Sequence, residues 1–354
     1  GGKPNEAALR KRLNAIKATE FPWMSEVTKV APQNAIKNVG VAFQNFFRRV
    51  KQGGKPGYPR FKRKGVHDAF RADNGPKDAS SNAVECDGKT IKLPRCGAVR
   101  MREHLRFTGR TLAATVSKQA DGWYVAILVD TADCLSGPLH RGTVGVDLGI
   151  KELATLSTGE VIPSLKPHRA AHARLVRLSR SLSRKQKGSS NRAKAKTKLA
   201  KLHKRIADIR TDALHKLTTK LATEFDTIAI EDLNVAGMLR NRCLARSIAD
   251  AGFSEFRRQL EYKAVMTGAH VHVVDRFFPS SKTCHSCGTI HPMKLSDRVM
   301  VCDCGMVLDR DLNAAMNLKQ HAASSAVSAC GEESSGSGRK TGTKLASMKQ
   351  EVEV

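Results

Sequence analysis

Four cysteines in two close pairs constrain the fold of this chain more than any other feature. Cys284 and Cys287 form a C-x-x-C pair, and Cys302 and Cys304 form a C-x-C pair. Fourteen residues separate the pairs, which is enough for a short hairpin. Four thiolates in this pattern can surround one Zn²⁺ tetrahedrally. In a chain without a secretory context such spacing is typical of a metal site, so we predict a structural zinc ribbon over residues 281–308.

The second cysteine pair is one residue tighter than the usual zinc knuckle. If one of its thiolates does not reach the ion, a neighbouring side chain could replace it, and the candidates are His285, His291 and Asp303. The alternative is a loop of four reduced thiols without a metal. A zinc ribbon stabilises a fold, so by itself it indicates no catalysis.

The net charge indicates a nucleic acid as partner. The chain has 354 residues, with 61 Lys and Arg against 33 Asp and Glu, and a formal net charge of +28. Basic side chains that neutralise phosphates release counterions, which favours binding. Neither a run of 18 apolar residues nor a lipidation signal is present, so we expect no membrane partner. No signal peptide opens the chain, and nine cysteines without an even framework fit a reducing cytoplasm.

The first 140 residues divide into helices and strands. Apolar residues at helical spacing predict helices within residues 1–52, with their apolar stripes packed in a core. Five short strands are then expected, at residues 68–72, 89–93, 98–101, 111–119 and 123–130. Short strands joined by charged loops predict a small β-barrel over residues 53–140.

Two basic stretches are candidate nucleic-acid surfaces. In residues 53–65 aromatic and basic side chains alternate, so phosphates could be held while a ring stacks on a base; the alternative is a solvated basic loop. Residues 166–220 hold 18 Lys and Arg and two acids, and a break at residues 187–190 predicts a basic helical hairpin. The predicted contacts are Lys55, Tyr58, Arg60, Lys62, Arg63, Lys64, Arg184, Lys185 and Lys187.

Three carboxylates occupy unusual places. Asp147 and Glu231 each lie near the end of an apolar strand, and Asp311 lies near the start of a helix. Parallel neighbouring strands could place the first two side by side. Clustered acids repel one another, and two Mg²⁺ ions that neutralise them could activate a water for phosphodiester cleavage. The alternatives are a helix N-cap for Asp311 and unrelated surface acids for the set.

The chain resembles the TnpB family, the transposon-encoded RNA-guided nucleases related to type V CRISPR effectors. The resemblance rests on GVDLGIKELATLSTG, IAIEDLNV, SSKTCHSCG and CGMVLDRDLNAAMNL in this order, with FPWMSEV and KPGYPRFKRKG upstream. It covers about residues 20–320. The family usually has more chain before FPW, including part of the barrel and of the recognition helices.

The resemblance implies an α/β RNase H-like (RuvC-type) nuclease domain with an inserted zinc ribbon and a basic helical hairpin, plus N-terminal helices and a small wedge-like β-barrel. Residues 321–354, rich in Ser, Gly and charge, are expected to be disordered. The expected domains are a recognition-like segment 1–52, the barrel 53–140, the nuclease domain 141–280 with its hairpin 166–220, the ribbon 281–308, a final nuclease helix 309–320, and the tail.

The resemblance also implies a function. RNA derived from the transposon end would guide cleavage of double-stranded DNA beside a short target-adjacent motif, in a prokaryotic cytoplasm and on the nucleoid. By motif match Asp147, Glu231 and Asp311 take the Mg²⁺ positions, with Asp232 and Asp309 as second choices. The four cysteines would hold a structural Zn²⁺.

Two other functions stay open at this point. A chain without the usual N-terminal part could bind RNA or DNA as a regulator and not cut. A transposase that joins DNA ends itself could use similar carboxylate chemistry, although neither a tyrosine nucleophile motif nor an end-binding helix-turn-helix is evident.

Overall fold

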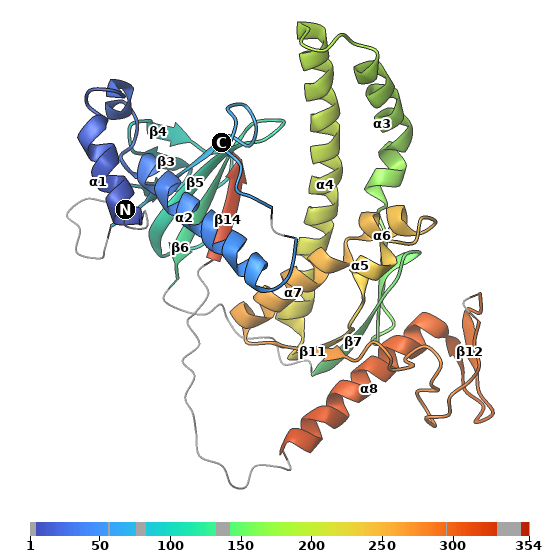
Figure 1. Ribbon diagram of the computed structural model, residues 1–354. Helices are drawn as coiled ribbons and strands as arrows, with labels where there is room; N and C mark the ends of the chain where they lie inside the picture. Colours follow the sequence, from blue (N-terminus) through green and yellow to red (C-terminus); the bar gives the residue numbers. More distant parts are fainter. Residues whose placement is uncertain are drawn as a thin grey trace. The chain divides into compact units, whose positions relative to one another are not determined.

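The chain forms two compact units. The computed structural model describes residues 5–55, 57–75, 83–131, 142–294, 296–330 and 348–353, the last range and residues 326–330 by their backbone alone. One unit comprises residues 1–132 with 341–354, and the other comprises residues 133–340 (Figure 1). Within the described ranges, no helix has both the length and the apolar character that a membrane crossing needs.

The first unit begins with two helices, α1 (Glu6–Ile16) and α2 (Val30–Lys51), separated by the short 3₁₀ helix η1 (Pro22–Ser25). Neither α1 nor α2 buries a residue, so the predicted core packing of their apolar stripes is wrong. The rings of Phe43 and Phe46 instead contact the edge of Tyr58. Nothing in the spacing of apolar residues could tell a solvent-facing stripe from a buried one.

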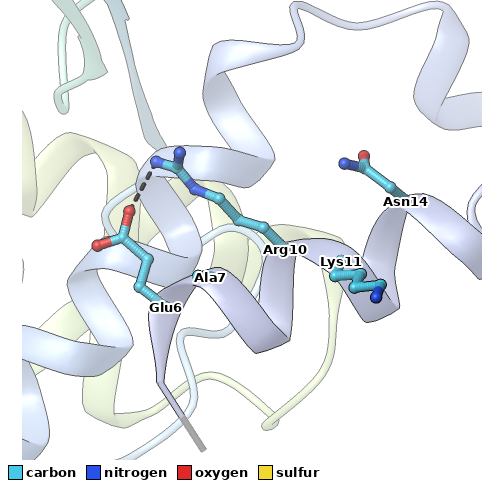
Figure 2. A pocket seen from close by; sticks show the side chains of 5 residues that line it. All are labelled: Glu6, Ala7, Arg10, Lys11 and Asn14. Carbon is cyan, nitrogen blue, oxygen red and sulfur yellow. Dashed lines mark ion pairs between the residues drawn. The ribbon is translucent and has the colours of Figure 1, made fainter.

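A hollow of about 530 Å³ lies along α1 (Figure 2). Its wall is one exposed face of this helix, where Arg10 forms an ion pair with Glu6 at 2.6 Å. The remaining lining residues are Ala7, Lys11 and Asn14. A surface with a single carboxylate that is already paired offers no chemistry, so we do not consider it a functional site.

Two antiparallel sheets complete the first unit. The four-stranded sheet has the order β1-β5-β6-β14, and the three-stranded sheet has the order β2-β3-β4. The strands of the first sheet are β1 (Ala69–Asp73), β5 (Arg110–Lys118), β6 (Trp123–Asp130) and β14 (Met348–Glu353). The strands of the second sheet are β2 (Glu85–Asp87), β3 (Thr90–Leu93) and β4 (Gly97–Arg100). The sheets share one apolar core that includes Ile91 and Ile127. All five predicted strands are present and β2 was not predicted; a closed barrel stays a prediction.

The C-terminal segment corrects the prediction of disorder over residues 321–354. Helix α8 (Arg310–Cys330) continues well beyond residue 320, and β14 pairs with β6 from Met348↔Val129 to Glu353↔Tyr124. The physical reason is that an edge strand has unpaired backbone groups, which a distant segment of polar composition can still satisfy. Residues 331–347 lie outside the described part.

A five-stranded mixed sheet forms the centre of the second unit. Its order is β11-β10-β7-β8-β9. Strands β7, β10 and β11 are parallel, whereas β8 and β9 continue from β7 as antiparallel neighbours. The strands are β7 (Thr143–Leu148), β8 (Glu152–Leu156), β9 (Val161–Pro163), β10 (Thr227–Glu231) and β11 (His270–Val274). Ile230 pairs with Val146, so the next residues, Glu231 and Asp147, come at the same end of neighbouring strands.

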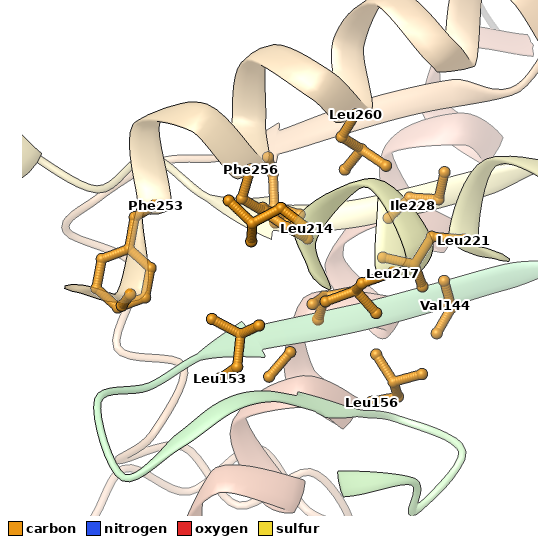
Figure 3. Close-up of a cluster of buried hydrophobic side chains, with 14 of the residues drawn as sticks. Val144, Leu153, Leu156, Leu214, Leu217, Leu221, Ile228, Phe253, Phe256 and Leu260 are labelled. Atoms are coloured by element: carbon orange, nitrogen blue, oxygen red, sulfur yellow. The ribbon is translucent and has the colours of Figure 1, made fainter. Parts of the chain in front are cut away.

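Helices cover both faces of this sheet. On one face α4 (Ser190–Glu224) and α7 (Phe253–Thr267) bury Leu221 and Phe256 against Val144 and Ile228 (Figure 3). On the other face α8 packs Leu318 against the sheet, in a cluster with Ala229, Val274 and Ala322. Residues alternate between the faces of a strand, so the face that α8 covers also carries Asp147 and Glu231. The short helices α5 (Val235–Met238) and α6 (Ala245–Ala251) lie between β10 and α7 in the chain.

The predicted basic hairpin is present as α3 (Pro167–Ser183) and α4. Leu175, Leu202 and Ile206 form its buried seam. The carboxylate of Asp250 accepts hydrogen bonds from two backbone amides in the first turn of α3, at 3.0 and 3.1 Å, and so anchors the base of the hairpin.

Candidate active site and zinc site

Helix α8 crosses β7 at Gly145, where the two backbones are in direct contact. A side chain at this position would collide with the carbonyl of Ala315, so only glycine allows the helix to lie this close. Asp147 follows Gly145 on the same face of the strand, and Asp311 precedes Ala315 by one helical turn. The contact therefore brings Asp311 to the end of β7.

Asp147, Glu231 and Asp311 come together at this end of the sheet. Burial, followed by the negative charges of Glu231 and Asp311, raises the pKa of Asp147 to about 8. Arg310 opposes this rise, and Asp309 adds a smaller negative contribution. Glu231 and Asp311 therefore lie close enough to Asp147 to act on its charge, and a shared metal site for the three side chains stays a prediction.

Asp309, and not Asp311, caps α8. Its Oδ1 accepts hydrogen bonds from the backbone amides of Asp311, at 2.9 Å, and of Leu312, at 3.2 Å. The alternative in which Asp311 is the N-cap is therefore wrong. Because Asp309 supplies the cap, the carboxylate of Asp311 is not used at the helix end; its Oδ1 lies 3.7 Å from Arg310 Nε.

Asp232, the other second choice, is engaged elsewhere. Its two oxygens accept hydrogen bonds from Arg276 and Arg257, and these contacts lower its pKa. The Arg257 Nη1 to Asp232 Oδ1 distance is 2.7 Å. Glu231 and Asp232 are adjacent in sequence but differ in role, since the strand directs consecutive side chains to opposite faces.

Three polar residues that sequence reasoning missed support the site. Ser280 donates a hydrogen bond from its hydroxyl to Glu231 Oε1. Asn317 Nδ2 donates to the carbonyls of Ser280, at 2.7 Å, and Thr283, at 2.6 Å. Asn313 Nδ2 also donates to Thr283, at 2.8 Å. A signal was available: two asparagines spaced by four residues lie on one face of a helix, among the apolar residues Ala314, Ala315 and Leu318, and indicate a polar contact.

The four cysteines form a compact cluster. Their Sγ atoms all lie within 4.8 Å of one another, and among the described residues this is the one group of three or more possible metal ligands so close together. The three carboxylates are thus less tightly gathered than the thiols. Hydrogen bonds with Thr289 lower the pKa of Cys287 to about 6, which favours the thiolate. The donor set fits Zn²⁺.

The tight C-x-C pair is compatible with this cluster because a glycine closes its turn. Gly305, at φ +87°, donates its N–H to the carbonyl of Cys302, and Gly288, at φ +79°, closes the first pair on Cys284 in the same way. The second pair lies in the turn between β12 (Val299–Val301) and β13 (Val307–Asp309). Of the proposed substitutes, His291 contacts Cys302 Sγ through Nε2 at 3.1 Å.

A hollow of about 370 Å³ adjoins Glu231. Leu148 and Phe253 supply apolar walls, and Arg257 and Arg276 supply positive charge. Of the three candidate carboxylates Glu231 alone lines this hollow, and its arginines are groups that can donate to phosphate oxygens.

The predicted nucleic-acid residues lie on two exposed surfaces, one in each unit. Tyr58 is 68% exposed. Lys55, Arg60, Lys62, Arg63 and Lys64 in the same stretch are exposed. At the turn between α3 and α4, Arg184 and Lys187 are exposed and Lys185 is half-buried. Their contact with nucleic acid stays a prediction.

Known families match most of the second unit. Residues 127–242 match the family OrfB_IS605, described as "Probable transposase". Residues 253–318, which include the four cysteines and Asp311, match the Cas12f1-like TNB domain. These two matches contain all three candidate carboxylates.

Curated relatives align over nearly the whole chain. A protein of Streptomyces pristinaespiralis named "Putative RNA-guided DNA endonuclease" is 40% identical over 351 residues, 95% of this chain and 81% of the relative. The protein with the same name and the symbol InsQ from Escherichia coli (strain K12) is 36% identical, over 89% of this chain and 79% of the relative. A solved Cas12f1–sgRNA–target DNA complex aligns with a TM-score of 0.55 at 15% identity, covering 90% of this chain and 76% of that chain, and supports the fold alone.

Proposed function

Since this chain belongs to the TnpB family of transposon-encoded proteins, we propose that it is an RNA-guided, Mg²⁺-dependent DNA endonuclease of an insertion sequence. The observation that carries the proposal is the meeting of Asp147, Glu231 and Asp311, which three separate elements of one unit bring together. The names of the relatives and the net charge of +28 support the same reaction.

The second unit is, in this proposal, an RNase H-like (RuvC-type) nuclease domain. Three parallel strands, two antiparallel neighbours and helices on both faces support the assignment. The cysteine cluster is its inserted zinc ribbon. The sheets of the first unit are a wedge-like domain, and α1 and α2 are a recognition-like part; the likeness to Cas12f1 over most of the chain supports both assignments.

The carboxylate set fits Mg²⁺ because this ion prefers hard oxygen ligands. Asp147, Glu231 and Asp311 would hold it, and a cation would offset both the burial and the neighbouring negative charges that raise the pKa of Asp147. When bound, Mg²⁺ lowers the pKa of an attacking water and stabilises the leaving oxygen of a phosphodiester.

The other residues of the site orient these ligands. The hydroxyl of Ser280 fixes one oxygen of Glu231, and because Asp309 supplies the cap, the carboxylate of Asp311 is not used at the helix end. Arg257 and Arg276, both bonded to Asp232, line the hollow next to Glu231 and could donate to the phosphates of a bound nucleic acid.

The proposed partners are a guide RNA from the transposon end and a double-stranded DNA target. Exposed basic groups would hold their phosphates, and the ring of Tyr58 could stack on a base. The residues proposed for these contacts are Lys55, Tyr58, Arg60, Lys62, Arg63, Lys64, Arg184, Lys185 and Lys187.

The test is cleavage by the purified protein–RNA particle. The chain is co-expressed with RNA from its own transposon end and incubated with a plasmid that carries a matching target, with Mg²⁺ or with EDTA. We expect guide-dependent linearisation that EDTA abolishes. Asp147→Asn should abolish cutting and retain guide RNA, whereas Asp212→Asn, an exposed ion-pair partner of Lys216 on α4, should cut normally.

Bound RNA without cutting by the unaltered particle would contradict the endonuclease and favour a regulator. Undiminished cutting by Asp147→Asn would contradict the site assignment alone.

A further inference from the structure

Phe277 is exposed to an unusual degree for its residue type. Its side chain is 86% exposed, on the turn that joins β11 to the cysteine segment. The adjacent Phe278 packs against the cluster formed by α8 and the sheet, so the chain buries one phenylalanine and presents the other. A large apolar ring in water gives up the stabilisation that burial would provide.

The turn is rigid on both sides of Phe277. The carboxylate of Asp275 accepts a hydrogen bond from the Phe277 amide at 2.8 Å, and its carbonyl accepts one from the Phe278 amide at 3.0 Å. The amide of Ser280 donates to the carbonyl of Phe278 at 2.8 Å. These bonds hold the backbone at Phe277 and so fix the point on the turn from which the side chain starts.

Both flanks of the turn contact the acids at the end of β10. Arg276 binds Asp232, and Ser280 binds Glu231. Asn317 holds the carbonyl of Ser280 from α8. The turn that carries the exposed ring is thus attached to the candidate site through Ser280 and Glu231, and to the neighbouring Asp232 through Arg276.

The surroundings of the ring favour a nucleic acid as its partner over an apolar protein surface. Asp275 and Arg276 beside it are exposed and polar, and Arg257 and Arg276 line the hollow next to Glu231. An exposed aromatic ring next to a basic residue, on a chain with a net charge of +28, is typical of proteins that hold single strands through base stacking and phosphate contacts.

We propose that Phe277 stacks on an unpaired base of the DNA strand whose phosphodiester lies at the three carboxylates. The inference rests on the proposed endonuclease and adds a positioning residue to it. The stacked base fixes the strand next to Glu231 and so selects which phosphodiester is cut.

The test combines a protein change with a DNA change. Single-turnover cutting is measured for the unaltered chain, Phe277→Ala, Phe277→Tyr and the control Val265→Ala, which removes another exposed apolar side chain, 62% exposed, from α7 of the same unit. Each target carries one abasic nucleotide at a successive position near the cut. The loss of one stacked base should slow cutting about tenfold.

We expect Phe277→Ala to cut about tenfold more slowly, and Phe277→Tyr and Val265→Ala to cut normally. At one position the abasic nucleotide should slow cutting by the unaltered chain. At that position Phe277→Ala should cut the abasic target as fast as it cuts the intact target, because both changes remove the same contact. Normal cutting by Phe277→Ala, or additive losses at every position, would overturn the inference.

A binding measurement separates this inference from the proposed function. A strand with 2-aminopurine near the cut is bound to Asp147→Asn protein, with and without Phe277→Ala. If 2-aminopurine fluoresces less with Asp147→Asn protein than with the protein that also carries Phe277→Ala, the ring stacks on the base. If the unaltered particle nevertheless does not cut, the stacking is supported and only the proposed endonuclease activity is contradicted. Equal fluorescence at all positions, in a particle that does cut when unaltered, contradicts the stacking alone.

Discussion

A β-carbon on Gly145 would lie 1.8 Å from the carbonyl oxygen of Ala315 and 2.7 Å from the amide nitrogen of Lys319. Strand β7 and helix α8 therefore meet backbone to backbone. Asp147 lies two residues beyond this contact on the strand, and Asp311 lies one turn before it on the helix. The contact sets the separation of the two carboxylates.

Gly145→Ala should push α8 away from β7 and reduce cutting at least a hundredfold. The methyl group meets backbone, which cannot move aside as a flexible side chain would, and we expect a loss of about 3 kcal/mol in the free energy of unfolding. Denaturant unfolding and cutting are measured on the same preparation. Gly40→Ala in α2, where nothing lies within 4 Å of the added carbon, is the control and should be neutral or stabilising. Normal cutting by Gly145→Ala would contradict this account of the site.

The strands that carry the site could be predicted because their pattern is strong. Alternation of apolar and small residues placed Val144 and Val146 on one face and Gly145 and Asp147 on the other. The same pattern around Glu231 predicted a second strand, and the observed register places the two strands side by side. Only the order of motifs, through family resemblance, connected Asp311 to this pair.

The choice between Asp309 and Asp311 could not be made from composition. Both are good capping residues. Which one caps the helix depends on the residue at which β13 ends and α8 begins, and the sequence does not define that boundary to within one residue. In the same way Phe43 and Phe46 have helical spacing, but spacing does not reveal whether another element covers the stripe. Tertiary contacts decide both questions.

Asp147→Asn should stabilise the metal-free protein while it abolishes cutting. The folded state raises the pKa of Asp147 from 3.8 to about 8, so between these values the unfolded chain has lost a proton that the folded chain keeps. The free energy of unfolding therefore falls as pH rises through this window. Asparagine removes the penalty, and we expect a Tm about 5 °C higher in EDTA at pH 8 and a small difference at pH 4.

Calorimetry of both proteins in EDTA, at several pH values, checks this prediction. The apparent affinity for Mg²⁺ should also weaken as pH falls below about 8, since the ion competes with a proton. A Tm of the Asn variant that stays below the unaltered value at pH 8 would show that folding does not raise the pKa of Asp147.

Asn317→Ala should destabilise the protein and impair the site together. Asn317 is 4% exposed and donates to two carbonyls; that of the buried Ser280 would lose this donor, whereas that of Thr283 would keep the one from Asn313. We expect a cost of about 2–4 kcal/mol. Because Ser280 is then no longer held, its hydrogen bond to Glu231 should loosen and cutting should fall even at temperatures where the variant is folded. Asn14→Ala, at an exposed position of α1, should change stability by less than about 0.5 kcal/mol. Equal stability of the two variants would rule out the buried contact.

Replacement of Cys302 by serine should release one zinc ion and loosen the cysteine segment. Cys302 is buried and its Sγ lies 3.4 Å from that of Cys287, so no other thiol can take its place in the cluster. Elemental analysis should find one zinc per unaltered chain and none in Cys302→Ser, and amide exchange should rise over residues 281–309 but not in the five-stranded sheet. Cys96→Ser, at an exposed thiol outside the cluster, should keep its zinc.

His291→Ala decides between the two possible ligand sets: retained zinc supports four cysteines, whereas zinc loss would mean that His291 replaces one of them.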